Sequence, residues 1–391
     1  MLARVGAAEL ERVEEQEFPV PLGLLTDDAD FIARRIDPLP AGFLDHSTMT
    51  FQFFNQSWLI RVDGLTVLVD PCNGNGRHRK VPYFDNQTLP WLERLAAAGA
   101  APETVDVVFC THLHNDHCGW NTTWSGDRWV PTFPRAQYVF TETEYQRWDT
   151  GAERQHPNLY NESVFDECVR PVVEAGQAVL VSPPYQVSPS VTIEAAPGHT
   201  EGHAMLRLES QGQRAYFTGD AFHHPAQVSR PELRLPGCDQ PAMAIGARRA
   251  LVARLHSEQA LLFPAHFAAP HYGTVGREAN EHVFVPASGL RRAQPERDRT
   301  PGRAPARRLR QIQPAAGRVP EGHHPDRPAA AVLLEHQHPR VGAGHRHPLA
   351  VGGQLLGRPP ASGNHHGPEL SKPNPQRLPP RSSPRAGAVV V

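Results

Sequence analysis

Short apolar runs separated by polar or turn-forming residues recur through the middle of the chain, a pattern typical of strands. Two of them flank Asp63-Gly64 and predict a β-hairpin, because Asp-Gly favours the tight turn that joins antiparallel strands. Asn55-Gln56 separates two earlier runs, and the run at 260–263 is expected to be the last strand. The expected strands are 51–54, 58–62, 66–70, 105–110, 178–181, 191–195, 204–208, 215–218 and 260–263.

Segments with the apolar spacing of helices alternate with these strands. They are residues 89–98, which end before Gly99, and residues 142–148, 162–174 and 242–256. Residues 1–45 are acidic at first and then rich in turn formers, and we expect them to form an N-terminal extension packed on the core. Helices alternating with strands, after hairpins at the start, predict an α+β fold.

The composition changes sharply near residue 287. Residues 288–391 contain 17 Lys and Arg against 6 Asp and Glu, a net charge of +11, whereas the rest of the chain carries −13. They also contain 17 of the 40 prolines and none of the 29 aromatic residues. Such a segment has little apolar surface to offset its ordering entropy. We therefore expect one acidic globular domain, 46–287, followed by a basic, disordered tail.

Two interpretations of this tail are possible. A basic arm could attract nucleic acid or acidic partners. Alternatively, an irregular mixture of Arg, Pro, Gly, Ala and His is typical of GC-rich coding DNA translated in a shifted frame. We favour the second interpretation and expect no nucleic-acid partner for the globular domain. Paired histidines in the tail, such as His323-His324, are not expected to bind metal, because no strand positions them.

The remaining global features suggest a cytoplasmic protein. The sequence has no apolar stretch of about 18 residues that would predict a membrane span, and residues 1–17 lack the apolar segment of a secretory signal. The cysteines are odd in number and scattered, without a Cys-x-x-Cys pair, so we expect no disulfide framework. They are Cys72, Cys110, Cys118, Cys168 and Cys238.

A dense group of metal-binding residue types follows the expected strand 105–110. His112, His114, Asp116 and His117 lie within six positions, and imidazole and carboxylate are ligands that zinc and similar divalent ions take. In a loop leaving a strand, His112 and His114 can face one side while Asp116 and His117 turn toward a neighbouring point. One such loop can therefore serve two metals.

Three further candidates also come just after expected strands. His199 lies in Pro-Gly-His-Thr, Asp220 follows Thr-Gly, and His266 follows Pro-Ala. Ligand types placed repeatedly at strand ends suit a single site along one edge of a sheet.

In these motifs the sequence resembles the metallo-β-lactamase-fold hydrolase superfamily, whose pattern is His-x-His-x-Asp-His, a His in a Gly-His-Thr turn, an Asp after Gly, and a late His. The resemblance covers residues 46–287 and implies a four-layer αβ/βα sandwich with a binuclear site. It implies that the first metal is held by His112, His114 and His199, and the second by Asp116, His117 and His266. Asp220 would bridge the two metals, which we expect to be zinc, with manganese, iron or cobalt as alternatives.

This site implies hydrolysis. Two cations would lower the pKa of a shared water from about 15.7 toward about 7, and the hydroxide would attack a carbonyl carbon or a phosphorus. One metal would stabilise the negative charge that develops on the substrate oxygen. Asp116 could orient the hydroxide and pass a proton to the leaving group.

Several neighbours of the ligands are expected to support them. Asp70 ends the strand 66–70 and is well placed to accept the ring N–H of a ligand histidine. His203 is expected to be structural or to contact a ligand, while Cys118 is expected to be a small buried side chain. Thr111 and Thr200 either hydrogen-bond ligand carboxylates or cap turns.

The ligand set also narrows the activity. The antibiotic-cleaving lactamases of this superfamily carry Cys where this chain has Asp220, and its flavo-diiron oxidoreductases carry an acidic residue in place of His114. Nuclease relatives have a large additional domain, for which residues 46–287 leave no room. The remaining classes are lactonases, arylesterase- or phosphotriesterase-like enzymes and glyoxalase II-like thioesterases.

His223 separates these classes further. It stands where the N-acyl homoserine lactonase pattern has Tyr, and in this respect the chain looks more like methyl parathion hydrolase relatives. His223 could bind the substrate oxygen or protonate the leaving group, or it could be a surface residue beside Pro225. Four aromatic residues near the ligand motifs could line an apolar pocket or belong to the core, namely Trp120, Trp124, Phe222 and Phe267.

We therefore predict a dinuclear metal-dependent hydrolase that cleaves a small-molecule ester or lactone with an apolar acyl or aryl group. Phosphotriesterase activity, thioesterase activity and a catalytically inactive metal-binding module remain the alternatives. The oligomeric state does not follow from the sequence.

Overall fold

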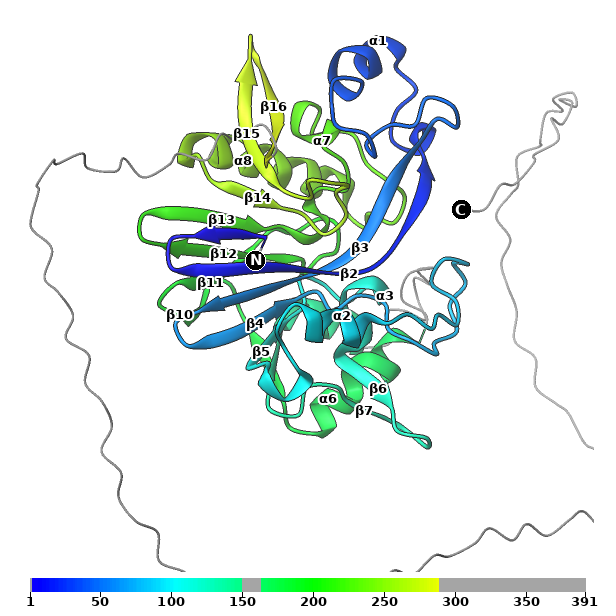
Figure 1. The fold of residues 1–391 in the computed structure, drawn as a ribbon, viewed down its shortest axis with the longest axis vertical. Helices are drawn as coiled ribbons and strands as arrows, with labels where there is room; N and C mark the ends of the chain where they lie inside the picture. The colour runs from blue at the N-terminus through cyan, green and yellow to red at the C-terminus, as the bar shows by residue number, and fades with distance from the viewer. Residues whose placement is uncertain (1, 150–162, 288–391) are drawn as a thin grey trace, which may run out of the picture. The chain divides into compact units, whose positions relative to one another are not determined.

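The structure is a computed structural model, and it describes residues 2–149 and 163–287. Two seven-stranded sheets form its centre (Figure 1). The first contains, in spatial order, β1 (Ala3–Val5), β2 (Ala8–Pro21), β3 (Thr50–Val62), β4 (Leu65–Val69), β5 (Val107–Phe109), β8 (Gln137–Thr141) and β9 (Ala178–Val181). Strands β1 to β4 run antiparallel, whereas β4, β5, β8 and β9 are parallel.

In the second sheet the strands lie in space in the same order as they occur in the sequence. It contains β10 (Tyr185–Ser188), β11 (Val191–Ala195), β12 (Ala204–Ser210), β13 (Gln213–Phe217), β14 (Leu261–Phe263), β15 (Gly273–Glu278) and β16 (Glu281–Pro286). Its neighbouring strands are antiparallel except for β13 and β14, which are parallel. A separate hairpin joins β6 (Thr122–Trp124) to β7 (Trp129–Pro131).

Helices cover the outer faces of both sheets (Figure 1). On the first sheet these are α2 (Trp91–Ala97), α4 (Glu142–Asp149) and α6 (Arg170–Glu174), and on the second α8 (Pro241–Glu258). The shorter helical segments are η1 (Leu22–Leu24), α1 (Ala29–Phe31), η2 (Ile32–Ile36), η3 (Pro102–Thr104), α3 (Asn115–Cys118), η4 (Gly119–Asn121), η5 (Phe165–Val169), η6 (Gly219–Ala221) and α7 (Ala226–Ser229). The prediction of a four-layer αβ/βα sandwich is therefore confirmed.

Alternation along each strand builds these layers, because successive strand side chains point to opposite faces of the sheet. In β5, Val107 and Phe109 join the core between the two sheets, whereas Val108 packs with the helices outside. In β13, Phe217 likewise faces the inner core while Tyr216 packs toward α8. Strands buried on both faces read as continuous apolar runs, and this explains why β5 and β13 were predictable, although β8, which lies between β5 and β9, was not predicted.

Two strand predictions are wrong. Asn55 and Gln56 do not end a strand; they lie inside β3 and are buried, because β3 is paired on both sides, with β2 and further along with β4. The strand β14 is not the last, since the β15–β16 hairpin follows it. That hairpin has a glycine-containing strand and charged ends, so its apolar pattern is weak.

The N-terminal region also contains more strand than its sequence suggested. β2 pairs with β3 from Glu9 to Pro21, and β1 extends the sheet beyond it. Residues 3–21 therefore contribute two strands to the first sheet, although no strand was predicted there.

The predicted helix at 162–174 is split in two. Glu162 lies outside the described residues, and η5 and α6 follow one another from Phe165 to Glu174. Pro171 has no N–H, so it cannot donate the helical hydrogen bond to Glu167 O. Thr122 Oγ1 donates to that carbonyl instead, at 2.6 Å.

Three further predictions concerned membrane spans, disulfides and the C-terminal tail. No helix among residues 2–149 and 163–287 is long and apolar enough to cross a membrane. All five cysteines are free, so none is in a disulfide with another described residue. The tail, residues 288–391, lies outside the described residues.

Candidate metal centre

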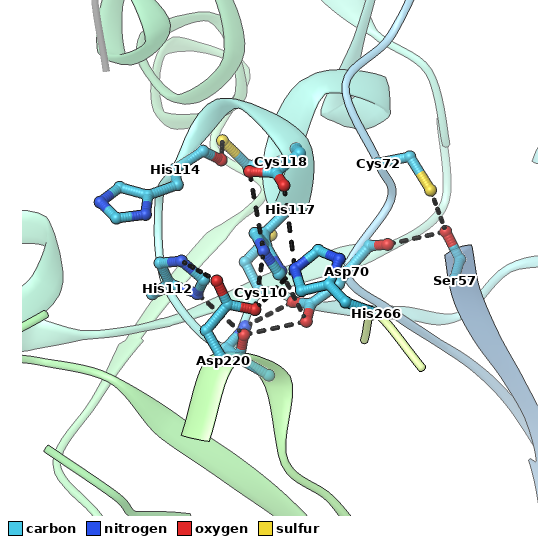
Figure 2. A network of polar contacts seen from close by, with 12 residues as sticks. Ser57, Asp70, Cys72, Cys110, His112, His114, His117, Cys118, Asp220 and His266 are labelled. Carbon is cyan, nitrogen blue, oxygen red and sulfur yellow. Dashed lines mark hydrogen bonds and ion pairs between the residues drawn. The ribbon is translucent and has the colours of Figure 1, made fainter. Parts of the chain in front are cut away.

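The seven side chains predicted to bind metal lie together, because each follows a strand that ends at the same edge of the sandwich. The loop after β5 and the start of α3 carry four of them, and the segments after β11, β13 and β14 carry one each. Figure 2 shows His112, His117, Asp220 and His266 converging, with His114 beside them. The seven residues are His112, His114, Asp116, His117, His199, Asp220 and His266.

Asp220 lies at the middle of the cluster. One of its carboxylate oxygens faces His112 and His199, and the other faces His117 and His266. Its Oδ2 is 3.1 Å from His199 Nε2 and 3.8 Å from His112 Nε2. Its Oδ1 is 2.8 Å from His266 Nε2 and 3.2 Å from His117 Nε2. The carboxylate can therefore contact two ions at once.

His114 and Asp116 complete the cluster, one in each of its two halves. His114 Nδ1 lies 3.1 Å from His199 Nε2, and Asp116 oxygens lie 3.7 Å from His117 Nε2 and 3.8 Å from His266 Nε2. Within each half, one possible ligand atom per residue lies within 4.8 Å of the others. The halves are His112, His114, His199 and Asp220 on one side, and Asp116, His117 and His266 on the other.

The hydrogen bonding of these rings fits divalent cations. His266 Nδ1 is 2.7 Å from Phe54 O, and His112 Nδ1 is 3.1 Å from Thr111 Oγ1, so one ring nitrogen of each is held. The opposite Nε2 atoms are buried and make no hydrogen bond with any described residue. Buried polar atoms without hydrogen bonds are costly, and a cation between these nitrogens and the Asp220 carboxylate would supply a partner to both.

Burial keeps the histidines of the first group neutral; this group, called the first metal group below, consists of His112, His114 and His199 with Asp220. Burial lowers the pKa of His114 from 6.5 to about 3 and lowers the pKa of His112 and His199 well below 6.5. Neutral imidazole is the form that binds metal. Burial also opposes charge on His117, but Asp220, Asp116 and Asp70 together outweigh it and raise the pKa of His117.

A comparison with known families agrees with this arrangement. The family model of the Metallo-beta-lactamase superfamily matches residues 51–266, which include all seven cluster residues. The chain belongs to this superfamily.

Curated relatives of this superfamily member include lactonases. An N-acyl homoserine lactonase, AiiA, of Bacillus thuringiensis subsp. kurstaki is 25% identical over 191 residues, covering 47% of this chain and 67% of the relative. An N-acyl homoserine lactonase of Bacillus cereus is 23% identical over the same length and coverage. These relatives support the prediction of a metal-dependent hydrolase.

Solved structures share the fold. AidC, a dizinc quorum-quenching lactonase in complex with a product, aligns with a TM-score of 0.59 and 18% identity, covering 74% of this chain and 97% of AidC. The hydrolase AbOPH of the beta lactamase superfamily aligns with a TM-score of 0.59 and 20% identity, covering 73% of this chain and 96% of AbOPH.

Asp70 lies against the ring of His117, where the sequence placed it, although His117 Nδ1 makes no hydrogen bond with any described residue. Its Oδ2 lies 3.0 Å from His117 Nδ1, on the side of the ring away from Asp220. The Thr111 backbone N–H and hydroxyl donate to Asp70 at 2.7 and 2.9 Å. The carboxylate therefore orients His117 and ties the ligand loop to the end of β4.

Thr111 and Thr200 do not hydrogen-bond the ligand carboxylates, so that alternative is wrong. Thr111 binds Asp70, and the Thr200 hydroxyl donates to Glu144 at 2.7 Å. His203 contacts the site as expected: its Nε2 accepts the Asp220 backbone N–H at 3.1 Å, and its Nδ1 is 2.9 Å from Ala196 O. Cys118 is fully buried, as expected.

His223 lies in the site, so the surface interpretation is wrong. Its side chain is 7% exposed, and its Nε2 is 3.1 Å from Asp220 Oδ2. Gln227 Oε1 accepts the His223 backbone N–H at 2.6 Å and fixes this turn. The His223 Nδ1 atom makes no hydrogen bond with any residue that the structure describes.

The four aromatic residues proposed for a pocket lie elsewhere. Trp120 stacks on Trp91 in the core beneath the first sheet, and Phe222 and Phe267 belong to the core beneath α8. Trp124 is 55% exposed and packs against Trp129 in the β6–β7 hairpin.

An aromatic residue that does contact the site is Phe53, which was predicted only as part of a strand. Its ring stacks on His266 with a centroid distance of 4.0 Å and lies 6.4 Å from the His223 ring. A strand phenylalanine carries no local signal of such a contact. Another contact missed from the sequence is Glu144, a buried carboxylate at the start of α4.

Proposed function

We propose that this protein is a dinuclear metal-dependent hydrolase that cleaves an ester or lactone bearing an apolar acyl or aryl group. The observation that carries the proposal is Asp220 between two sets of imidazoles, with a separate oxygen directed to each. The lactonase relatives, at 25% identity, support a lactone or ester as the substrate class. All seven proposed ligands lie within residues 46–287, which we propose as the catalytic domain.

Each half of the cluster would hold one ion, with zinc as the first choice. His112, His114 and His199 would hold one, Asp116, His117 and His266 the other, and Asp220 both. Bound cations would supply a water of lowered pKa and a Lewis acid for the substrate oxygen. Because the dizinc lactonase AidC shares only the fold at 18% identity, the identity of the metal here rests on the donor set.

The chain's own residues would position the substrate and move the proton. Asp116 is the most exposed of the three residues Asp116, His117 and His266, at 9%, so it can contact a water or a substrate group that enters the site. His223 presents an Nδ1 atom with no described partner and can bind a substrate oxygen or protonate the leaving group. Phe53 would place apolar surface beside His266 and His223.

Metal content and a substrate panel test this proposal together. Purified protein should contain about two divalent ions per chain and hydrolyse aryl esters or acyl lactones; less than about one ion, with no gain on reconstitution, would refute it. Asp220→Ala should lose metal and lower turnover by more than about 100-fold, because both groups lose their shared ligand. A metal-loaded protein inactive on every substrate would support a catalytically inactive binding module instead.

Phosphotriester hydrolysis is the second candidate, and His223 is the observation that favours it. His223 occupies the position at which the lactonase pattern has Tyr, and it lies directly beside Asp220. His223→Tyr should raise the ratio of lactone to phosphotriester turnover if this residue selects the substrate. Thioesters belong in the same panel to test the glyoxalase II-like alternative.

The cysteine content bears on the cellular setting. Five free cysteines, four of them buried, suit a reducing compartment, so we propose a cytoplasmic location. The partner of the catalytic domain would be a small-molecule substrate rather than a nucleic acid.

A further inference from the structure

We propose that Glu144 is a positioning residue that holds the two ligand loops of the first metal group at the spacing the ion requires. The proposal deepens the proposed function, because it rests on His112, His114 and His199 being metal ligands. It concerns a residue outside the seven-residue cluster and outside the sequence motifs.

Glu144 is 1% exposed, although it lies in the first turn of α4, where glutamate usually faces solvent. Its carboxylate accepts four hydrogen bonds from described residues. Oε1 accepts the Leu113 N–H at 3.0 Å and Trp148 Nε1–H at 2.8 Å. Oε2 accepts the Thr200 hydroxyl at 2.7 Å and the Gly202 N–H at 3.1 Å.

Three of these donors belong to the ligand loops. Leu113 lies between His112 and His114, so its N–H fixes the backbone that carries both rings. Thr200 follows His199 directly, and Gly202 lies three positions after that histidine. One carboxylate therefore links the two chain segments that supply the three imidazoles of the first group.

The second loop is also held tightly against α4. Thr141 Oγ1 donates to Gly202 O at 2.7 Å and accepts the Glu144 N–H at 3.1 Å. A side chain at Gly202 would place its Cβ 2.2 Å from the Glu144 nitrogen. The loop backbone therefore packs directly against the first turn of α4, and the hydrogen bonds from Thr141 and to Glu144 hold it there.

The charge of Glu144 suits this role. Two backbone N–H groups and an indole N–H can only donate, so the four-bond arrangement matches an ionised carboxylate. Burial opposes that charge and raises the pKa of Glu144, and its hydrogen bonds oppose the rise. An amide NH2 in place of one oxygen would leave at least one N–H group without an acceptor, because among the four donors only the Thr200 hydroxyl can turn and accept instead.

Glu15 offers a matched control within the same chain. It is also 1% exposed, and it accepts the Asn73 and Gly74 N–H groups and the Trp120 indole N–H at 2.7 to 3.0 Å. Its donors lie outside both segments that carry the first metal group. Glu15→Gln therefore makes the same chemical change in a similar buried environment without releasing a ligand loop of that group.

The experiment compares full-length wild-type protein with Glu144→Gln, Thr200→Val and Glu15→Gln. Zn²⁺ affinity is measured by competition with a chromophoric chelator, and Co²⁺ absorption reports the geometry of the bound ion. The thermal midpoint of each chelator-treated protein reports the loss of stability alone. We expect Glu144→Gln to weaken one of the two ions by about 10- to 100-fold and to change the Co²⁺ spectrum, because partners of metal ligands contribute affinity on this scale.

Thr200→Val should weaken the same ion by a smaller factor, and it keeps the test usable if Glu144→Gln does not fold. Glu15→Gln should lower the thermal midpoint while leaving the affinity for the ion that Glu144→Gln weakens within about twofold of wild type. Equal metal affinities in wild type, Glu144→Gln and Thr200→Val would overturn the inference, as would equal losses in Glu144→Gln and Glu15→Gln. A wild-type chain that binds no metal would instead refute the proposed function.

Discussion

Asp220 carries a negative charge into a buried position, 5% exposed, where the groups around it are mainly histidine rings. Burial opposes the charge, and the neighbouring His117, His266, His223 and His199 outweigh burial and lower the pKa of Asp220. A buried charge of this kind needs a compensating charge. Divalent cations would provide it and leave the rings of the first group neutral.

At the residue scale, His223 gives the sharpest test of catalysis apart from metal binding. His223→Gln should lower kcat on the best substrate by about 100-fold, the contribution typical of a positioned proton donor. Metal content should stay at the wild-type value, because the proposed ligands are untouched. Kinetics with parallel metal analysis would check this, and loss of metal equal to that of Asp220→Ala would instead identify His223 as a ligand.

At the scale of elements, the site depends on loops held against rigid neighbours. The loop that carries His199 packs on the N-terminal turn of α8, where a Cβ on Gly198 would lie 2.1 Å from Ala244 N. The backbone of Gly198 also has a φ of +129°, which side chains rarely adopt. In the interior of α8, Gly246 is exposed and a Cβ there would meet nothing within 4 Å.

Two glycine substitutions should therefore act in opposite directions. Gly246→Ala should stabilise the protein by about 0.5–1 kcal/mol, because alanine favours the helix and restricts the unfolded chain. Gly198→Ala should destabilise it by more than about 1 kcal/mol through the clash and the backbone strain. Denaturant unfolding of both variants checks this; a stabilising Gly198→Ala would contradict the packing described.

At the scale of the whole molecule, Asp63 connects the two sheets. It lies in the turn between β3 and β4 and accepts hydrogen bonds from the Ser188 hydroxyl at 2.7 Å and from Ser190 N–H and hydroxyl at 2.8 and 3.0 Å. These serines flank the β10–β11 turn of the second sheet. The Ser188 hydroxyl is the largest cause that lowers the pKa of Asp63.

This contact should give a pH-dependent contribution to stability. Because the pKa is lower in the folded protein, the contribution is present above the ordinary value of 3.8 and is lost as pH falls through the folded pKa. Asp63→Asn should cost roughly 0.5–1 kcal/mol at pH 7, since solvent screens this exposed group. Urea unfolding at pH 7 and near pH 3 checks it; an unchanged difference at both values would contradict the assignment.

The opposite net charges of residues 1–287 and 288–391 lead to a prediction about the tail. The proposed site lies wholly within the described residues before 288, whereas the net charge of +11 belongs to residues 288–391. A chain ending at Ala287 should keep wild-type metal content and turnover. Salt-dependent DNA binding by the full chain that is lost on truncation would favour the basic-arm interpretation over the shifted-frame one.

Much of this architecture was accessible from local patterns. Apolar runs identified most of the strands of both sheets, and the ligand types immediately after them identified the site. Asp70 was predictable for the same reason, because it ends β4 beside β5. The N-terminal strands were missed because β2 has many charged residues, and its burial depends on pairing with β3.

Residues whose roles depend on distant partners could not be recognised in the sequence. Glu144 looks like an ordinary glutamate in the first turn of a helix, and its donors lie 31 to 58 positions away apart from Trp148. Phe53 meets His266 across more than 200 residues of chain.

The linear order of residues thus determined which ligand types end which strands, because hydrophobic periodicity and short motifs are local properties. Only the folded chain decided that His223 is buried beside Asp220 and that Trp120 and Phe222 belong to the cores. It also decided that Glu144 joins the loop of His112 and His114 to the loop of His199. The physical reason is that burial and hydrogen-bond partners depend on which elements pack together.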